Sequence, residues 1–157
     1  MTGFIDADQV HPLFVIHKPG KDLSAGEIDV MKSLWAHAPF GEWDINPASI
    51  YFLGREKDAE GPAVTTLTLS LGQDIPGEIW KLEKFVTSSC LRKHGYGTEL
   101  LEHALVYAKD WSEASYVQLI CRKKTQQVIR ICEKLGFELA EEIPYDVPLL
   151  RYLYSLR

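Results

Sequence analysis

The chain has 157 residues, of which 46% are hydrophobic and 25% charged, and its formal net charge at pH 7 is −5. These values are ordinary for a globular protein, so we expect a single domain over residues 1–157. The negative charge argues against broad nucleic-acid binding, which usually requires a basic face. No apolar run approaches the ~20 residues that span a membrane.

The three cysteines, Cys90, Cys121 and Cys132, are odd in number and lack the spacing of a metal site. We therefore expect reduced thiols, a cytoplasmic location and no bound metal. The first residues show neither the basic start nor the apolar core of a signal peptide, which agrees with that location.

The N-terminal part predicts strands and one amphipathic helix. Leu13–His17 has the character of a strand, and Ser24 with Glu27 has the spacing of a capping box for a helix that runs to about Ala38. The loop 39–47 has room for a second short helix. Further strands are expected over 49–55, over 64–71 and from about 79, with turns at 58–62 and 73–77. Strands joined by such short turns predict an antiparallel meander.

The C-terminal part alternates helices and strands. Apolar residues recur at helical spacing after residue 97, in the order Leu101, Ala104, Leu105, Ala108 and Trp111. A strand over 116–121, a helix over 125–135 and strands over 137–142 and 149–156 are expected to follow. The whole series predicts the α/β (α+β) class, with a mixed, mostly antiparallel twisted sheet and helices on both faces.

The most specific motif is Arg92-Lys93-His94-Gly95-Tyr96-Gly97, which follows the strand Trp80–Thr87 and opens a helix. Glycines at a helix entry let backbone N–H groups point at an anion, and the helix dipole adds to them. We expect the amides from about Lys93 to Thr98 to hold a pyrophosphate. A dinucleotide-binding turn would need a third glycine where Leu100 stands. A plain strand-to-helix turn is the alternative.

This motif, the helix and strand after it, and the later turn Leu135-Gly136-Phe137 together resemble the GCN5-related N-acetyltransferase (GNAT) superfamily over residues 80–137. The resemblance implies an enzyme that transfers acetyl from acetyl-CoA directly to a primary amine in a ternary complex. The acceptor would be a small-molecule or protein amine, with no nucleic acid or membrane as partner; a homodimer stays open. It also implies cofactor contacts at Phe85, Val86, Thr87, Arg92, Lys93, His94, Gly95, Tyr96, Gly97 and Thr98.

Two other functional classes stay open beside this one. A module that binds acyl-CoA without turnover is the first alternative. A nucleotide-binding protein is the second, although the following strand lacks an acidic ribose ligand.

The resemblance also places the chemistry on the strand Trp80–Thr87. In the family a bulge there frees a backbone N–H to bond the thioester oxygen, and the spacing puts this amide at about Phe85. Trp80 and Leu82 alternate regularly and Phe85 breaks their parity, as one inserted residue would cause, whereas Val86 keeps the earlier parity. Glu83 is the leading general base. A surface ion pair between Glu83 and Lys81 is the competing interpretation.

The chain departs from the family pattern in the helix 125–135. Cys132 stands where many members have the tyrosine that protonates the departing thiolate, and Thr125 replaces a frequent asparagine. We expect Cys132 to be a small core residue. The acid step is therefore in doubt, whereas cofactor binding is not.

Other candidates carry less weight. His37, Asp44 and His103 are less favoured as catalytic groups than Glu83. Relatives build their acceptor pocket where Phe40, Trp43 and Asp44 lie, although core packing explains these aromatic residues equally well. The basic run at 122–124 is more typical of a solvated loop than of a contact with CoA phosphates.

Overall fold

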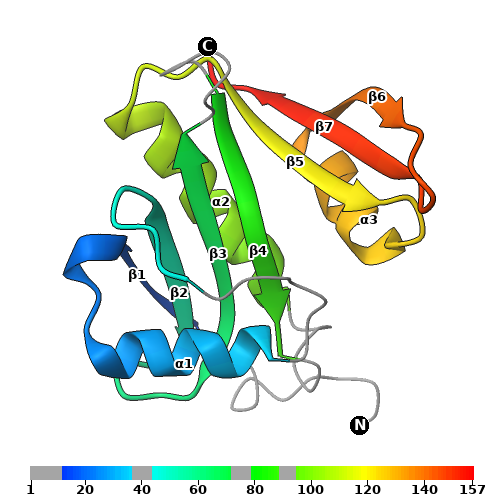
Figure 1. Ribbon diagram of the computed structural model, residues 1–157. Coiled ribbons are helices and arrows are strands. Elements are labelled where there is room, and N and C mark those ends of the chain that lie inside the picture. Colours follow the sequence, from blue (N-terminus) through cyan, green and yellow to red (C-terminus); the bar gives the residue numbers. More distant parts are fainter. Residues whose placement is uncertain (1–11, 37–43, 72–78, 89–94) are drawn as a thin grey trace, which may run out of the picture. The chain divides into compact units, whose positions relative to one another are not determined.

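The protein is described by a computed structural model over residues 12–36, 44–71, 79–88 and 95–157. Within these residues, seven strands form one sheet in the order β1-β2-β3-β4-β5-β7-β6 (Figure 1). The strands are β1 (Leu13–Pro19), β2 (Ile50–Glu56), β3 (Ala63–Leu71), β4 (Ile79–Thr87), β5 (Tyr116–Arg122), β6 (Glu138–Ile143) and β7 (Leu149–Ser155). The helices are the short 3-10 helix η1 (Gly20–Asp22), α1 (Ala25–Trp35), α2 (Tyr96–Trp111) and α3 (Gln126–Leu135).

The sheet is mixed, as the sequence predicts. β4 and β5 pair in parallel, from Ile79 opposite Tyr116 to Leu82 opposite Leu119. The pairs β1–β2, β5–β7 and β6–β7 are antiparallel. The predicted fold class is therefore confirmed. No helix in the described part of the chain has the length and apolar character needed to cross a membrane.

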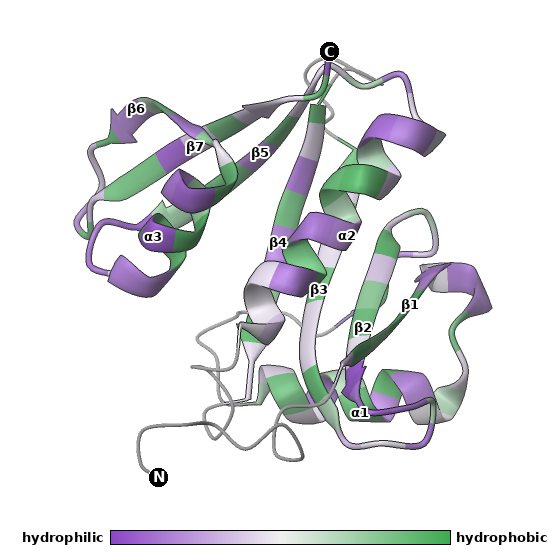
Figure 2. Cartoon of the chain, turned by 180° about the vertical axis from the view of Figure 1, so that it is seen from behind, coloured by the Kyte–Doolittle hydropathy of each residue, from purple (hydrophilic) through white to green (hydrophobic). Residues whose placement is uncertain are grey.

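The chain separates into two compact units. The first unit contains the residues up to Leu67 together with Lys84–Leu101, and the second contains Thr68–Glu83 together with Glu102–Arg157. The single domain expected over residues 1–157 stays a prediction. In the first unit, α1 and the start of α2 lie on opposite faces of β4 (Figures 1 and 2).

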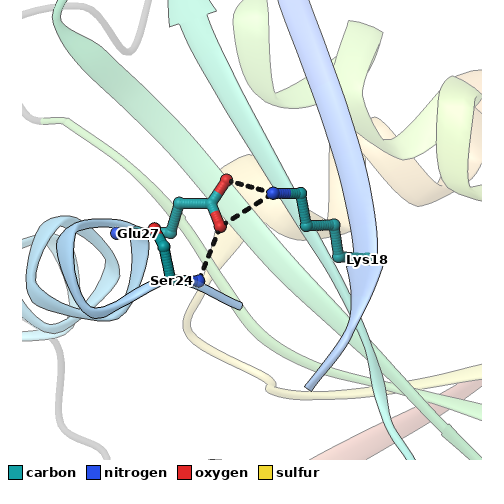
Figure 3. Close-up of polar contacts among 3 residues, drawn as sticks. All are labelled: Lys18, Ser24 and Glu27. Carbon is teal, nitrogen blue, oxygen red and sulfur yellow. Dashed lines mark hydrogen bonds and ion pairs between the residues drawn. The ribbon is translucent and has the colours of Figure 1, made fainter. Parts of the chain in front are cut away.

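The capping box predicted at the start of α1 is confirmed (Figure 3). The Ser24 hydroxyl accepts the Glu27 N–H at 3.1 Å, and the Ser24 N–H donates to the Glu27 carboxylate at 2.8 Å. The Lys18 ammonium lies 3.0 Å from the same carboxylate. Partial burial acts to raise the pKa of Glu27, but the hydrogen bonds from Ser24 and Lys18 outweigh it and the pKa lies below its ordinary value. The helix ends at Trp35, earlier than the predicted Ala38.

The core of the first unit lies between α1 and β2. Met31 and Trp35 of α1 are fully buried against Tyr51 and Leu53 of β2. Val86 of β4 packs against the edge of this cluster. The end of β4 therefore shares its packing with α1, which matters for the site described below. The short helix expected within 39–47 falls largely on residues 37–43, outside the described part.

The second unit contains α3 and the C-terminal strands. Ile129 and Cys132 of α3 are buried, whereas the side of α3 turned to the viewer in Figure 2 is mostly hydrophilic. The helix ends at Leu135 and is capped by Gly136, whose φ of +97° favours glycine. The next amide, of Phe137, donates to the Cys132 carbonyl at 2.9 Å. The centre of the Phe137 ring lies 5.2 Å from the centre of the Tyr154 ring in β7.

Candidate functional site

A tight turn at Gly95 opens α2. Gly95 has a φ of +78°, and its carbonyl accepts the first helical hydrogen bond, from the Glu99 N–H at 3.0 Å. The N–H groups of the first turn of any α-helix have no partner inside the helix, and the helix dipole makes this end positive. The turn therefore has the backbone geometry of an anion site, which suits a phosphate or pyrophosphate.

The two glycines of the turn have different structural roles. A Cβ atom at Gly95 would meet no atom within 4 Å, so only the positive φ requires glycine there. A Cβ atom at Gly97 would lie 2.8 Å from the Thr87 Oγ1 and 3.3 Å from the Phe85 ring. Gly97 thus allows α2 to approach β4 closely. The first glycine sets the shape of the turn, and the second sets its position against the strand.

Tyr96, between the two glycines, fastens the turn to the sheet. Its side chain is buried, and its hydroxyl donates to the Glu56 carboxylate, at the end of β2, at 2.9 Å. Sequence reasoning placed Tyr96 in the cofactor loop but missed this anchor. No spacing rule predicts it, because the two partners lie 40 residues apart.

The strand β4 has a backbone irregularity at Lys84, whose φ is +50°. Before it, Trp80 donates from its indole N–H to the Ser112 hydroxyl at 2.9 Å, and its ring meets Tyr107 of α2. After it, Phe85 lies beside Gly97 at the start of α2. A regular strand would send positions 80 and 85 to opposite faces. Both contact α2, so one extra residue is inserted between them, which is the effect of a β-bulge.

Lys84 and Val86 point the other way, toward α1. The Lys84 ammonium lies 5.2 Å from the centre of the ring of Trp35, which is fully buried. Such a cation–π contact contributes about 0.5–2 kcal/mol, whereas a left-handed backbone at a residue other than glycine costs about 1–3 kcal/mol. The contact therefore offsets the backbone strain in part or in full, but it adds no clear net stability.

The Phe85 amide directly follows this irregularity. A bulge leaves one residue outside the regular ladder of hydrogen bonds, which is the condition that the predicted oxyanion donor requires. The role of the Phe85 N–H as that donor stays a prediction.

Threonine hydroxyls hold the last residues of β4. The buried Thr65 hydroxyl donates to the Val86 carbonyl at 3.0 Å and lies 3.0 Å from the Thr87 hydroxyl. Because the single Thr65 proton is used on Val86, the Thr87 hydroxyl must donate to Thr65. The Ser88 N–H donates to the Val64 carbonyl at 2.7 Å. Sequence reasoning missed the role of Thr65, since no local pattern marks it.

Glu83, the predicted general base, is exposed at the residue before Lys84. The ion pairs found within the described ranges join Lys18 to Glu27, Lys123 to Glu142 and Arg151 to Glu141. The competing ion pair between Glu83 and Lys81 is therefore not present in that part of the chain. The catalytic role of Glu83 stays a prediction.

The other predicted residues differ in whether the structure describes them. Outside the described residues lie Arg92, Lys93 and His94 of the turn, and the candidates His37, Phe40 and Trp43. Asp44 and His103 are exposed, and Thr98 is half-buried in the first turn of α2. Among the side chains that the structure describes, no three of His, Cys, Asp or Glu gather to hold a metal ion.

In the second unit, Cys132 is fully buried, in agreement with its prediction as a core residue. Burial, with smaller effects of Cys121 and Glu133, raises the pKa of the Cys132 thiol to about 12. Burial also raises the pKa of Tyr152. The Cys132 thiol is thus protonated at neutral pH and unreactive.

Lys123 of the basic run pairs with Glu142 at 2.9 Å on the surface, as in an ordinary solvated loop.

A comparison with protein-family models identifies one family. The model of the acetyltransferase (GNAT) family matches residues 21–137. A search of curated proteins finds no significant match.

Solved structures share the fold at low identity. An acyl-CoA N-acyltransferase from Pseudomonas aeruginosa has a TM-score of 0.73 at 21% identity, over 90% of this chain and 99% of that one. The ribosomal-protein-S18-alanine N-acetyltransferase from Escherichia coli has a TM-score of 0.70 at 14% identity, over 91% and 94%. NAA60 from Arabidopsis thaliana, in complex with a bisubstrate analogue, has a TM-score of 0.72 at 12% identity, over 90% and 98%.

Proposed function

The chain belongs to the acetyltransferase (GNAT) family, and from this premise we propose that it transfers an acetyl group from acetyl-CoA directly to a primary amine in a ternary complex. The observation that carries the proposal is the contact of Gly97 with Phe85 and Thr87. It holds the positive start of α2 against the irregular end of β4 within the first unit. One site for a pyrophosphate and one for a thioester oxygen would thereby be held at a fixed spacing.

Each part of this site has a proposed task. The amides from about Lys93 to Thr98 bind the pyrophosphate, and the Phe85 N–H bonds the thioester oxygen as negative charge develops on it. Glu83 accepts the proton that the amine loses. The names of the similar structures, an acyl-CoA N-acyltransferase and a ribosomal-protein-S18-alanine N-acetyltransferase among them, support this reaction class.

The chemical step forms a bond between the amine nitrogen and the acetyl carbon and breaks the bond from that carbon to sulfur. CoA then leaves as a thiolate. A thiol has an ordinary pKa of about 8.5, so its thiolate is a tolerable leaving group without a strong acid beside it. This matters because Cys132, where relatives often have a tyrosine acid, is a buried thiol with a pKa of about 12.

The contact of Gly97 with Phe85 and Thr87 also favours one alternative, a module that binds acyl-CoA without turnover.

The free thiols Cys121 and Cys132 agree with a proposed cytoplasmic location. The acceptor, proposed to be a small-molecule or protein amine, is addressed below.

The test begins with binding. Calorimetry with acetyl-CoA, CoA, ATP and NAD should show binding of the first two alone; absence of acetyl-CoA binding would refute the proposal and its alternative together. Thiol release across a panel of amines then separates the two, because a binding module releases no CoA with any amine.

A substitution tests the proposed base. Glu83→Gln should lower turnover by roughly 10²-fold and keep the affinity for CoA. Glu113→Gln is a matched control, since Glu113 is also exposed and lies outside the proposed site. A wild-type rate for Glu83→Gln would remove Glu83 from the mechanism but leave cofactor binding in place.

A further inference from the structure

Lys84 holds a positive charge beside the proposed oxyanion donor. It directly precedes Phe85 in β4, it is half-buried, and its ammonium faces the ring of Trp35 at 5.2 Å. Within the described ranges, no oxygen accepts a hydrogen bond from this ammonium and no carboxylate pairs with it. The ring covers one side of the group, but none of the oxygen atoms in the described ranges accepts a hydrogen bond from its N–H donors.

Stability alone does not explain a lysine at this position. The backbone of residue 84 is left-handed, where glycine would be free of strain. The contact with the Trp35 ring is similar in size to that strain. A half-buried charge also loses part of its hydration, and no oxygen atom of the described residues replaces the lost water. Strained residues of this kind concentrate at functional sites, and the missing partner is the feature that a ligand would supply.

We propose that Lys84 is a specificity-determining residue that binds a negatively charged group of the acceptor. The inference rests on the proposed function. The attacking amine must approach the acetyl carbon whose oxygen is held by the Phe85 N–H, so groups close to that amine come near the neighbouring Lys84. The preferred acceptors are then amines with a carboxylate near the nitrogen, such as amino acids. Polyamines, which carry only positive charge, are disfavoured by like-charge repulsion.

The test uses matched trios of acceptors. Each trio contains an amino acid, its amide and its decarboxylated amine, and each is assayed for kcat/KM by thiol release. The wild type should prefer the amino acid over the decarboxylated amine by about tenfold or more, the size expected for one hydrogen bond to a charged group. Lys84→Met should remove most of this preference, because methionine keeps an apolar stem for Trp35 but no charge. Lys84→Arg should retain it.

Lys81→Met is the matched control, a lysine three residues earlier on the same strand, and it should keep the wild-type ratio. The amines differ in intrinsic reactivity, but this difference cancels when the ratio is compared between variants. Acetyl-CoA affinity and thermal unfolding of each variant show whether the site is intact.

The outcomes are distinct. If Lys84→Met lowers kcat/KM equally for all members of a trio, Lys84 has only a structural role and the inference is wrong. A wild type that prefers the decarboxylated amines or polyamines also overturns it, while the proposed acetyl transfer stands. If the wild type releases no CoA with any amine, the proposed function itself fails and the inference fails with it.

Discussion

Substitutions at Gly95 and at Gly97 should both destabilise the turn that opens α2, but for different physical reasons. Gly95→Ala forces a side chain onto a backbone with a φ of +78°, which costs about 1–3 kcal/mol. It creates no collision, because the space around that Cβ is open to 4 Å. Gly95→Asn should cost less, since asparagine tolerates this conformation better than other residues do.

Gly97→Ala causes a steric collision and no backbone strain, the reverse of Gly95→Ala. Alanine is favoured over glycine in a helix by about 1 kcal/mol, but the new Cβ would lie 2.8 Å from the Thr87 Oγ1. Thr87 cannot yield freely, because its hydroxyl is bonded to Thr65 at 3.0 Å. Breaking that bond and forcing an extra methyl group into this close contact costs about 1–3 kcal/mol. The gain offsets part of this cost, so the net loss of unfolding free energy should be about 0–2 kcal/mol.

A double-mutant cycle separates the two mechanisms. Thr87→Ala removes the oxygen that collides, so it should partly rescue Gly97→Ala, with a coupling energy of about 1 kcal/mol in denaturant unfolding. The same change should be additive with Gly95→Ala. In calorimetry, folded Gly95→Ala should bind CoA more than about tenfold more weakly, and Gly95→Asn should recover part of this loss.

The result that would refute this reasoning is specific. If Gly97→Ala unfolds at the wild-type denaturant concentration and shows no coupling to Thr87→Ala, α2 does not pack against β4 at this point. If Gly95→Ala binds CoA as the wild type does, the left-handed turn is not what presents the amides to the cofactor.

Two further predictions concern groups away from this turn. Cys132→Ala should reduce stability by about 1 kcal/mol through a small cavity and change turnover only a few-fold, with no acetyl adduct on the wild type in intact-mass analysis; a hundredfold loss of rate in a stable variant would show that the thiol takes part in the reaction. The pKa of Glu27 is lower in the folded state than its ordinary 4.5, so its contribution to stability is present above that pH and is lost as the pH falls through the folded pKa. Glu27→Gln should therefore destabilise the protein more at neutral pH than well below pH 4.5, and an equal loss at both pH values in denaturant unfolding would contradict the assignment.

Local patterns in the sequence predicted much of the fold. The capping box of Ser24 and Glu27 depends on residues three apart, and the strand and helix periods depend on neighbours within a few positions. The end of α1 was predicted too late, at Ala38 instead of Trp35. Helix ends are harder to predict than helix centres, because the last turn gains little from periodic packing.

The site was predictable only where its chemistry is local. The Gly95-x-Gly97 turn and the parity change at Phe85 are visible in the sequence. The contacts that hold these features in place join distant residues, such as Tyr96 with Glu56 and Lys84 with Trp35. Long-range partners leave no periodic signal in a single sequence, so they could not be found without the fold.

The inserted residue at Lys84 also has a consequence for how this strand can change during evolution. A shift of one position exchanges the two faces of a strand. Deletion of one residue here would turn Phe85 and Thr87 away from Gly97 and bring Val86 to the helix in their place. Single substitutions along β4 can therefore be accepted one at a time during evolution. A deletion or insertion in β4, by contrast, would also require apolar and polar residues to exchange places in the rest of the strand. Insertions and deletions should accordingly be rarer at this point than in the turns at either end of the strand.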